Sequence, residues 1–255
     1  MTFKAFDGRR VGMLTPSSNT VLEPYTSAMF AQFGDEASVH FGRFRVVEIS
    51  LSEASQSQFA LEPILEAADR LAEAEPHLIA WNGTSAGWLG LERDRTLCAA
   101  ITERTGIPAT STMLAYDALF KRMGVTRLGL VTPYPADIEA RMIANYAARG
   151  IEVVDKMRLD DKGNFSYATY PPEQAGAMAE QVARAKPDAI AIVCTNFRGA
   201  PAAPRIEEAT GVPVLDSVAL TAAHCLSEVG LDPSRVTGWG SVFRLFARPS
   251  PTAPD

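Results

Sequence analysis

The sequence carries RVGMLTP at residues 10–16 and a near copy of it, RLGLVTP, at residues 127–133. Two further pairs follow in the same order: PHLIAWNGTS at 76–85 with PDAIAIVCTN at 187–196, and TGIP at 105–108 with TGVP at 210–213. The copies are separated by 117, 111 and 105 residues. Three matches in one order, with slowly shrinking offsets, are typical of a duplication followed by small deletions. We therefore expect two similar halves related by a pseudo-twofold axis.

Short apolar segments alternate with longer amphipathic segments along the whole chain. Strands are predicted in the apolar segments, at residues 11–14, within 39–49, and at 78–81, 128–131, 152–154, 189–193 and 212–215. Residues 55–74 have the apolar spacing of a helix. Strands that alternate with helices indicate βαβ units. The predicted fold class is α/β, with two pseudosymmetric halves, each a mainly parallel sheet flanked by helices, and the active site in the cleft between them.

The repeat also suggests how the chain is divided. We assign residues 1–115 to the first half, which residues 226–246 complete, and residues 116–225 to the second half. Residues 247–255 have the composition of a flexible tail.

Composition excludes several classes of protein. The chain has 255 residues, 47% of them hydrophobic, and a net charge of −6, which argues against nucleic-acid binding because phosphate contacts need a basic face. No segment approaches the ~20 apolar residues of a membrane span, and the first residues lack the apolar core of a signal peptide. Three scattered cysteines offer neither a disulfide framework nor a zinc site. We expect a cytoplasmic protein without metal or cofactor, and the sequence leaves its oligomeric state open, including a homo-oligomer.

Four polar loops follow predicted strands, at residues 15–20, 83–87, 132–137 and 194–199. In parallel α/β units, ligands bind where the carboxyl end of a strand meets the next helix. Two facing halves would bring all four loops to one cleft. We therefore expect the functional site there.

The repeat aligns Gly83 with Cys194, so one half provides a thiol where the other has none. A cysteine between a strand and a helix N-terminus can exchange between thiol and thiolate near neutral pH, although a small buried residue would give the same pattern. Cys98 and Cys225 lie inside helix-like segments, where packing is the expected role. A cysteine introduced at position 83 should face Cys194, at the cost of backbone strain if Gly83 has a positive φ.

Hydroxyl groups accompany both positions. Thr84 and Ser85 follow Gly83, and hydroxyls at a strand end can bind a carboxylate or an enolate, or simply cap a helix. Tyr134 lies in the matching loop of the second half and can donate its phenol to a carboxylate. Asn164 lies in a segment, KGNFS, that has the composition of a turn.

At these residues the chain resembles the aspartate/glutamate racemase superfamily, and within it the branch of maleate isomerase and arylmalonate decarboxylase. The resemblance extends over residues 10–246. It implies a cofactor-free enzyme with two pseudosymmetric α/β halves and, typically, one cysteine from each half beside the substrate.

The chain resembles each of the two enzymes of this branch in part. PSSNT at residues 16–20 resembles the maleate isomerase loop whose Asn, here Asn19, binds a substrate carboxylate, and Asn164 resembles a second such contact. Tyr134 matches the substrate-binding tyrosine of both enzymes. Gly83, Thr84 and Ser85 resemble arylmalonate decarboxylase, in which glycine replaces the first cysteine and the Thr/Ser pair belongs to a dioxyanion hole.

Cys194 matches the remaining cysteine, which is the proton donor. Thr195 and Asn196 depart from the decarboxylase pattern, because they occupy the place of a glycine pair. GWG at residues 238–240 resembles the closing strand of the family. The resulting candidate site has Cys194 as catalytic residue, no metal, and the following substrate-binding residues: Ser18, Asn19, Gly83, Thr84, Ser85, Tyr134, Asn164 and Thr195.

The absence of a cysteine at position 83 distinguishes racemisation and isomerisation from decarboxylation on chemical grounds. A two-base racemase, or an isomerase of the known type, needs a first-half cysteine, and Gly83 provides none. Decarboxylation of a substituted malonate needs one proton donor and hydrogen-bond donors for the enediolate, with an apolar wall that could involve Trp88, Leu89 or Met113. The main hypothesis is such a decarboxylase. The alternatives are a maleate-type cis-trans isomerase of a small unsaturated dicarboxylate and a dicarboxylate-binding protein without turnover.

Overall fold

Two four-stranded parallel sheets form the centre of the computed structural model, which describes residues 7–46 and 60–247. The first sheet has the strand order β2-β1-β3-β4, with β1 at Arg9–Pro16, β2 at Ala37–Phe44, β3 at Leu78–Trp81 and β4 at Ala109–Ser111. The second has the order β6-β5-β7-β8, with β5 at Arg127–Thr132, β6 at Glu152–Arg158, β7 at Ala189–Ile192 and β8 at Val214–Asp216. The predicted fold class of two parallel α/β halves is confirmed.

The strand register preserves the sequence repeat residue for residue. Val11 pairs with Leu78 as Leu128 pairs with Ala189, and Ile79 pairs with Ala109 as Ile190 pairs with Val214. These pairings reproduce the offsets of 117, 111 and 105 residues without a shift. The duplicated segments therefore occupy equivalent places in the two sheets.

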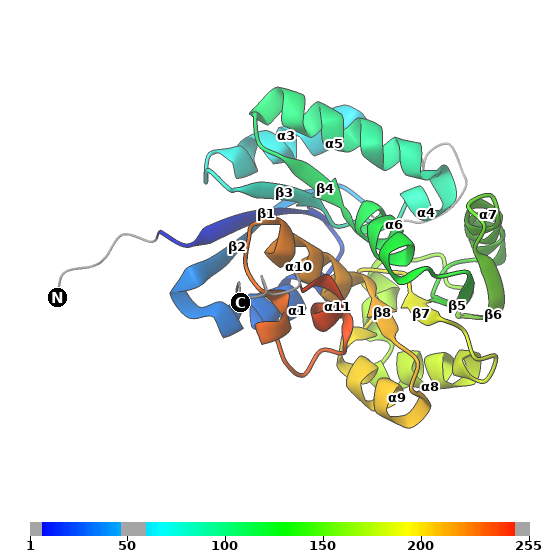
Figure 1. Cartoon of the computed structure of the whole chain (residues 1–255). Coiled ribbons are helices and arrows are strands. Elements are labelled where there is room, and N and C mark those ends of the chain that lie inside the picture. The colour runs from blue at the N-terminus through cyan, green and yellow to red at the C-terminus, as the bar shows by residue number, and fades with distance from the viewer. Residues whose placement is uncertain (1–6, 47–59, 248–255) are drawn as a thin grey trace.

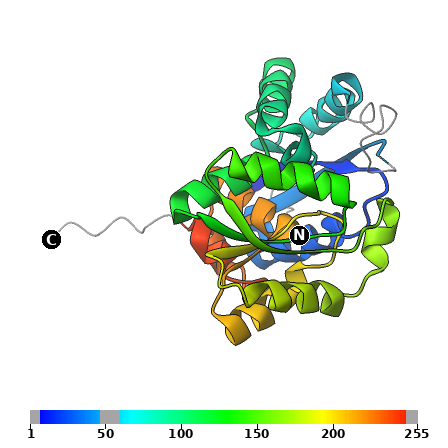
Figure 2. The same cartoon turned by 90° about the vertical axis from the view of Figure 1, so that its right-hand side faces the viewer.

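Helices cover the sheets on both sides. In the first half, α3 (Leu61–Ala72) and α5 (Leu91–Thr105) pack together, and in the second α8 (Pro172–Ala183) packs against α9 (Ala203–Thr210). The two pairs lie at opposite ends of the molecule in both views (Figures 1 and 2). The other helices are α1 (Leu22–Phe30), α4 (Ala86–Leu89), α6 (Thr112–Met123), α7 (Ala136–Ala147), α10 (Ser217–Glu228) and α11 (Val242–Phe246), with 3-10 turns at Ala31–Glu36, Phe165–Thr169, Ala200–Ala202 and Pro233–Arg235.

The helix α10 joins the two halves. It packs against α1 and β3 of the first half and against α6 and β8, and α11 packs on it in turn. Its N-cap is Asp216, whose carboxylate accepts hydrogen bonds from the N–H groups of Val218 and Ala219. The equivalent residue of the first half, Ser111, caps α6 through the N–H of Leu114. The proposed division at residues 115 and 116 falls within α6 and stays a prediction.

The structure corrects some details of the expected elements. The predicted strand within residues 39–49 is β2, which ends at Phe44, and residues 47–49 lie outside the described residues, as do 55–59 of the predicted helix and 248–255 of the tail. The three-residue strand β4 was not predicted. Residues 238–240 form no strand, because Gly238 and Gly240 have φ values of +82° and +94°.

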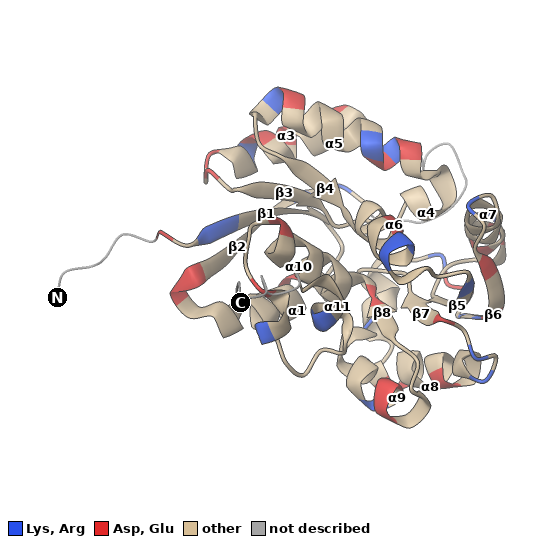
Figure 3. Ribbon diagram, in the orientation of Figure 1, with Lys and Arg blue, Asp and Glu red and all other residues tan. Residues whose placement is uncertain are grey.

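Lys and Arg residues alternate with Asp and Glu residues along the ribbon in Figure 3. No helix within residues 7–46 and 60–247 is long and apolar enough to cross a membrane.

Candidate functional site

Loops from both halves meet at one small cavity beyond the carboxyl ends of the strands. Most of the predicted site residues line it: Gly83, Thr84, Ser85, Tyr134, Asn164, Cys194 and Thr195. Pro16, Val46, Trp81 and Trp88 complete the described lining. The cavity has a volume of about 20 Å³, which leaves room for about one water molecule. The repeat thus placed Gly83 and Cys194 correctly, on one cavity between the halves.

Cys194 follows β7 and is 2% exposed. Its Sγ accepts a hydrogen bond from the backbone N–H of Asn196 at 3.4 Å, and its own N–H donates to Ser217 Oγ at 3.1 Å. Burial raises the pKa of the Cys194 thiol to about 12, although hydrogen bonds with Tyr134 and the Asn196 backbone lower it. The expected helix N-terminus does not follow directly, because the next α-helix begins at Ala203. Cys194 is therefore a protonated thiol at neutral pH rather than a thiol–thiolate pair.

Gly83 lies directly against the indole of Trp81. A Cβ atom on Gly83 would lie 1.8 Å from Cζ2 and 2.2 Å from Cε2 of Trp81. Gly83 is absent from the described glycines with positive φ, so the expected cause of strain at this position is wrong. Steric overlap with a 1% exposed indole is what excludes a side chain here.

Three hydroxyl groups face the same cavity from both halves. Thr84 Oγ1 and Tyr134 OH are 2.5 Å apart, which links the first-half loop to the second-half loop. The Tyr134 ring contacts Trp88 and Tyr167, with ring centroids 5.2 and 5.7 Å apart. Burial raises the pKa of Tyr134 well above 10, so its phenol stays a neutral donor. Together with Ser85, which is 3% exposed, these groups can donate hydrogen bonds to a carboxylate or an enediolate.

Asn19 reaches the site through Thr195. Its Nδ2 donates to Thr195 Oγ1 at 3.1 Å, while its Oδ1 accepts the N–H groups of Val21 and Leu22 at the start of α1. Thr195 Oγ1 donates in turn to the Asn82 carbonyl at 3.3 Å. Asn19 is not part of the described cavity lining, so the structure places it behind Thr195.

Ser18 and Asn164 form a second link between the halves. Asn164 Nδ2 donates to Ser18 Oγ at 2.8 Å, and Ser18 Oγ donates to the Val46 carbonyl at 2.6 Å. Asn164 lines the cavity, whereas Ser18 supports it from behind. The sequence thus predicted which loops meet at the cavity, but it did not distinguish residues that line the cavity from residues that support the lining.

Asn196 is a structural residue of the site that the sequence reasoning missed. Its Oδ1 accepts the N–H groups of Thr20 at 2.9 Å and Val21 at 3.2 Å, and its Nδ2 donates to the Asn164 carbonyl at 2.7 Å. It therefore fastens the loop after β7 to the start of α1. Its departure from the decarboxylase glycine pair was visible in the sequence and was the available signal.

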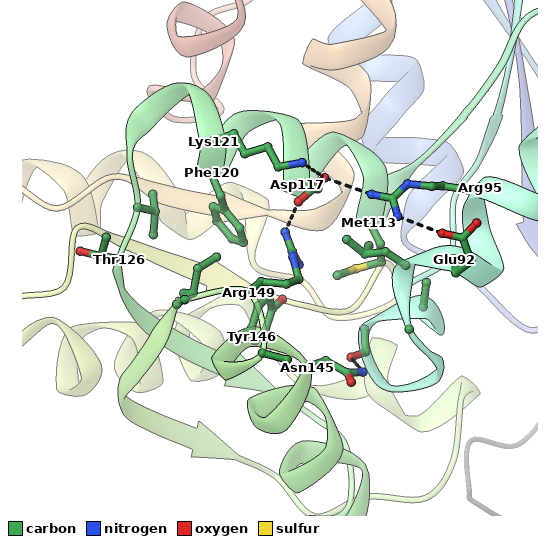
Figure 4. Close-up of a pocket in the computed structure, with 18 of the residues that line it drawn as sticks. Glu92, Arg95, Met113, Asp117, Phe120, Lys121, Thr126, Asn145, Tyr146 and Arg149 are labelled. Atoms are coloured by element: carbon green, nitrogen blue, oxygen red, sulfur yellow. Dashed lines mark hydrogen bonds and ion pairs between the residues drawn. The ribbon is translucent and has the colours of Figure 1, made fainter.

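The expected apolar wall is formed only in part. Trp88 lines the Cys194 cavity, but Leu89 and Met113 line two other cavities. The cavity at Met113 has a volume of about 670 Å³ and lies among α5, α6 and α7. Figure 4 shows three basic side chains directed at the carboxylate of Asp117 in this cavity: Arg95 from α5, Lys121 from α6 and Arg149 from the turn after α7. This larger cavity does not include Cys194.

The other two cysteines lie outside the described lining of the Cys194 cavity. Cys98 in α5 and Cys225 in α10 are buried and free, and burial raises the pKa of Cys98 to about 12. Within the part of the chain that the structure describes, no three His, Cys, Asp or Glu side chains are grouped to hold a metal ion.

The chain is similar to known proteins over most of its length. Residues 11–243 match the family model described as arylmalonate decarboxylase. The maleate isomerase of Alcaligenes faecalis is 26% identical over 245 residues, covering 91% of this chain and 95% of that protein. The arylmalonate decarboxylase of Bordetella bronchiseptica is 26% identical over 160 residues, covering 62% of this chain and 67% of that protein. A solved cysteine-to-serine variant of the Nocardia farcinica maleate cis-trans isomerase, with a covalently bound succinylcysteine intermediate, superposes with a TM-score of 0.83 at 24% identity, covering 92% of this chain and 98% of that one.

Proposed function

The chain belongs to the arylmalonate decarboxylase family, and we propose that it is a cofactor-independent enzyme that decarboxylates a small substituted malonate. The observation that carries this proposal is a single buried thiol, Cys194, on the same cavity as a glycine whose side-chain space is filled by Trp81. Such a site can deliver one proton to one face of a carbanion. It has no second thiol among its described lining residues for chemistry at the opposite face.

The retained carboxylate is the group that the hydroxyls of Thr84, Ser85 and Tyr134 would bind. When the bond between the α-carbon and the departing carboxylate breaks, CO2 leaves and its electron pair forms an enediolate on the retained carboxylate. Preorganised donors stabilise that charge, and loss of one such donor typically costs ~10²–10³ in rate. Cys194 then transfers its S–H proton to the α-carbon to form a C–H bond. The thiolate takes its proton back from water, which its raised pKa of about 12 favours.

The departing carboxylate would lie against apolar side chains. The side chains of Trp88, Val46 and Pro16 give this part of the cavity lining its apolar character. A carboxylate that loses its hydration there is destabilised relative to neutral CO2. Because the cavity has room for about one water molecule, binding of a diacid must open it.

Cis-trans isomerisation of a maleate-like dicarboxylate is the second candidate. It is favoured by the relatives, among which maleate isomerases are prominent, and by the succinylcysteine of the Nocardia farcinica enzyme. In this chain the nucleophile would have to be Cys194, the one cysteine in the described lining. Burial raises the pKa of this thiol, so the protonated form dominates at neutral pH, and that form can donate a proton directly but must ionise before it attacks as a nucleophile.

One experiment separates the candidates. The protein and its Cys194→Ala variant are incubated in parallel with methylmalonate and with maleate, and released CO2, propionate and fumarate are measured. The proposal expects CO2 and propionate from methylmalonate, with turnover reduced ~10²–10⁴-fold in the variant. Fumarate from maleate without CO2 from the malonate would instead assign the isomerase. Tight binding of both acids without any product would indicate a dicarboxylate-binding protein.

A further inference from the structure

We propose that Ser217 and Tyr116 are positioning residues for the proton transfer from Cys194: Ser217 fixes the backbone at the cysteine, and Tyr116 supports Ser217 from the neighbouring helix α6. The inference rests on the proposed function for the reaction in which the thiol acts. Neither side chain belongs to the described lining of the Cys194 cavity, so both act through Cys194 rather than on the substrate.

The backbone N–H of Cys194 is paired with a side chain rather than with a strand. The preceding N–H, that of Val193, still donates to the Val131 carbonyl at 2.9 Å and continues the pairing of β7 with β5. The Cys194 N–H instead donates to Ser217 Oγ at 3.1 Å. Because a buried backbone N–H needs a partner, the Ser217 hydroxyl replaces the carbonyl that a neighbouring strand would provide.

The Ser217 hydroxyl holds the backbone on both sides of Val193. It accepts the N–H of Cys194 and donates to the Ile192 carbonyl at 3.0 Å. Ser217 is buried and is the first residue of α10, so the hydroxyl has a fixed base. The direction in which the Cys194 side chain leaves the backbone is therefore set by this contact.

Tyr116 supports this contact from α6. Its OH donates to the Leu215 carbonyl at 2.7 Å. The same oxygen lies 3.1 Å from the Ile192 carbonyl oxygen and 3.3 Å from Ser217 Oγ. The buried phenol thus connects the ends of β7 and β8 directly beside the hydroxyl that holds Cys194.

The internal repeat provides a comparison within the molecule. Its offset of 105 residues pairs Thr112, the first residue of α6, with Ser217, the first residue of α10. The same offset pairs Tyr116 with Thr221. Thr112 Oγ1 donates to the carbonyl at the end of β3 at 3.4 Å and lies 2.8 Å from Thr221 Oγ1. Among the described residues, the hydrogen bonds of Thr112 include none from the N–H of Gly83, so the additional bond and the tyrosine occur on the side that carries the thiol.

Removal of the Ser217 hydroxyl affects one backbone group in particular. In Ser217→Ala the Ile192 carbonyl keeps the Tyr116 OH within reach at 3.1 Å, whereas the Cys194 N–H loses its partner. The cysteine can then turn away from the reacting carbon, and a misplacement of about 1 Å can cost ~10²-fold in rate. The hydroxyls that would bind the carboxylate are unchanged, so the loss falls on kcat rather than on KM.

The test measures kcat and KM for methylmalonate in the wild type, Ser217→Ala, Ser217→Thr, Tyr116→Phe and Thr221→Val. We expect Ser217→Ala to lower kcat roughly 30–100-fold and to change KM by less than about threefold. Ser217→Thr keeps the hydroxyl, and should retain kcat within about threefold, since the repeat has threonine at this place. Tyr116→Phe should lower kcat roughly tenfold. Thr221→Val is the matched control, because it removes the equivalent hydroxyl on the side without a thiol, and should leave kcat within about twofold.

Alkylation by iodoacetamide separates this inference from the proposed reaction, because it needs no turnover. Cys194 is buried, so the reagent reaches its Sγ only when the loop opens locally. Loss of the backbone anchor in Ser217→Ala should raise the labelling rate of Cys194 roughly tenfold. Cys98, which is buried in α5, should be labelled at the wild-type rate, and mass spectrometry of the peptides measures both.

The outcomes are distinguishable. Faster labelling of Cys194 alone, in a protein whose wild type releases no CO2, would reject the decarboxylase and retain Ser217 as the anchor of the cysteine. An undiminished kcat in a folded Ser217→Ala protein, an equal loss of kcat in Thr221→Val, or equal acceleration of labelling at Cys98 and Cys194 would overturn the inference. If Ser217→Ala does not fold, Tyr116→Phe against Thr221→Val still decides.

Discussion

Replacement of Gly83 by cysteine tests whether the Trp81 indole is fixed against the glycine. The new Cβ would lie 1.8 Å from Trp81 Cζ2, whereas ordinary contacts begin near 3.4 Å. The ring or the backbone must therefore move by about 1.6 Å in a well-packed core. Overpacking of this kind typically costs ~1–3 kcal/mol, so we expect Gly83→Cys to lower the free energy of unfolding by about 2 kcal/mol and the Tm by roughly 4–8 °C.

The assay is a double-mutant cycle with Trp81→Ala. Trp81→Ala alone should cost ~3–5 kcal/mol, because it removes a buried aromatic side chain. In that background the cysteine occupies space that the indole vacates, so Gly83→Cys should cost at least ~1 kcal/mol less than in the wild type. Urea unfolding of the four proteins, followed by circular dichroism, gives the coupling energy. An equal cost of Gly83→Cys in both backgrounds would refute the steric argument.

The same double variant has a chemical readout. With two thiols on one cavity, it should exchange the α-proton of a single-enantiomer 2-substituted acid from both faces in D2O and racemise it. Optical rotation and deuterium uptake follow the reaction. A folded double variant that binds the acid but shows neither change would mean that positions 83 and 194 do not flank one carbon.

Three further predictions concern buried groups. Burial raises the pKa of Asp94 from 3.8 to about 7. The folded state therefore binds this proton more tightly than the unfolded state does. The resulting stabilisation is complete below about pH 4 and is lost as the pH rises to 7. Asp94→Asn should remove roughly 3 kcal/mol of the fall in stability between pH 5 and pH 8, measured by urea unfolding at these two pH values. Asn196→Ala leaves backbone groups of Thr20 and Asn164 without their side-chain partner and should cost about 2–3 kcal/mol on unfolding, and turnover should fall with it. Cys98→Ala should leave kcat/KM within about twofold of wild type, and a value close to that of an inactive enzyme would contradict the assignment of its thiol to packing.

The arrangement of the two halves could be predicted because the sequence contains an internal repeat. The strand pairings have the same offsets as the repeated segments of the sequence. Gly83 and Cys194 therefore occupy equivalent positions in the folded chain. The loops after β1, β3, β5 and β7 meet for the same reason, since parallel strands bring their carboxyl ends to one edge. Local sequence and topology were sufficient for this part of the site.

The remaining features depend on contacts between distant segments. The contact between Trp81 and Gly83 depends on the rotamer of Trp81 and on packing in the core. The protonation of the Cys194 thiol depends on its burial. Asn196 accepts a hydrogen bond from the N–H of Val21, just before α1 and 175 residues away in the sequence. The strand β4 has three residues, too few for a periodic pattern.

The central claim is that one thiol protonates one face of the carbanion, and decarboxylation of methylmalonate in D2O tests it most directly. The wild type should give propionate with one deuteron at C2 in a single configuration, and Cys194→Ala should form it ~10²–10⁴-fold more slowly. Deuterium in equal amounts of both configurations, or an undiminished rate in the variant, would contradict the claim that Cys194 is the proton donor.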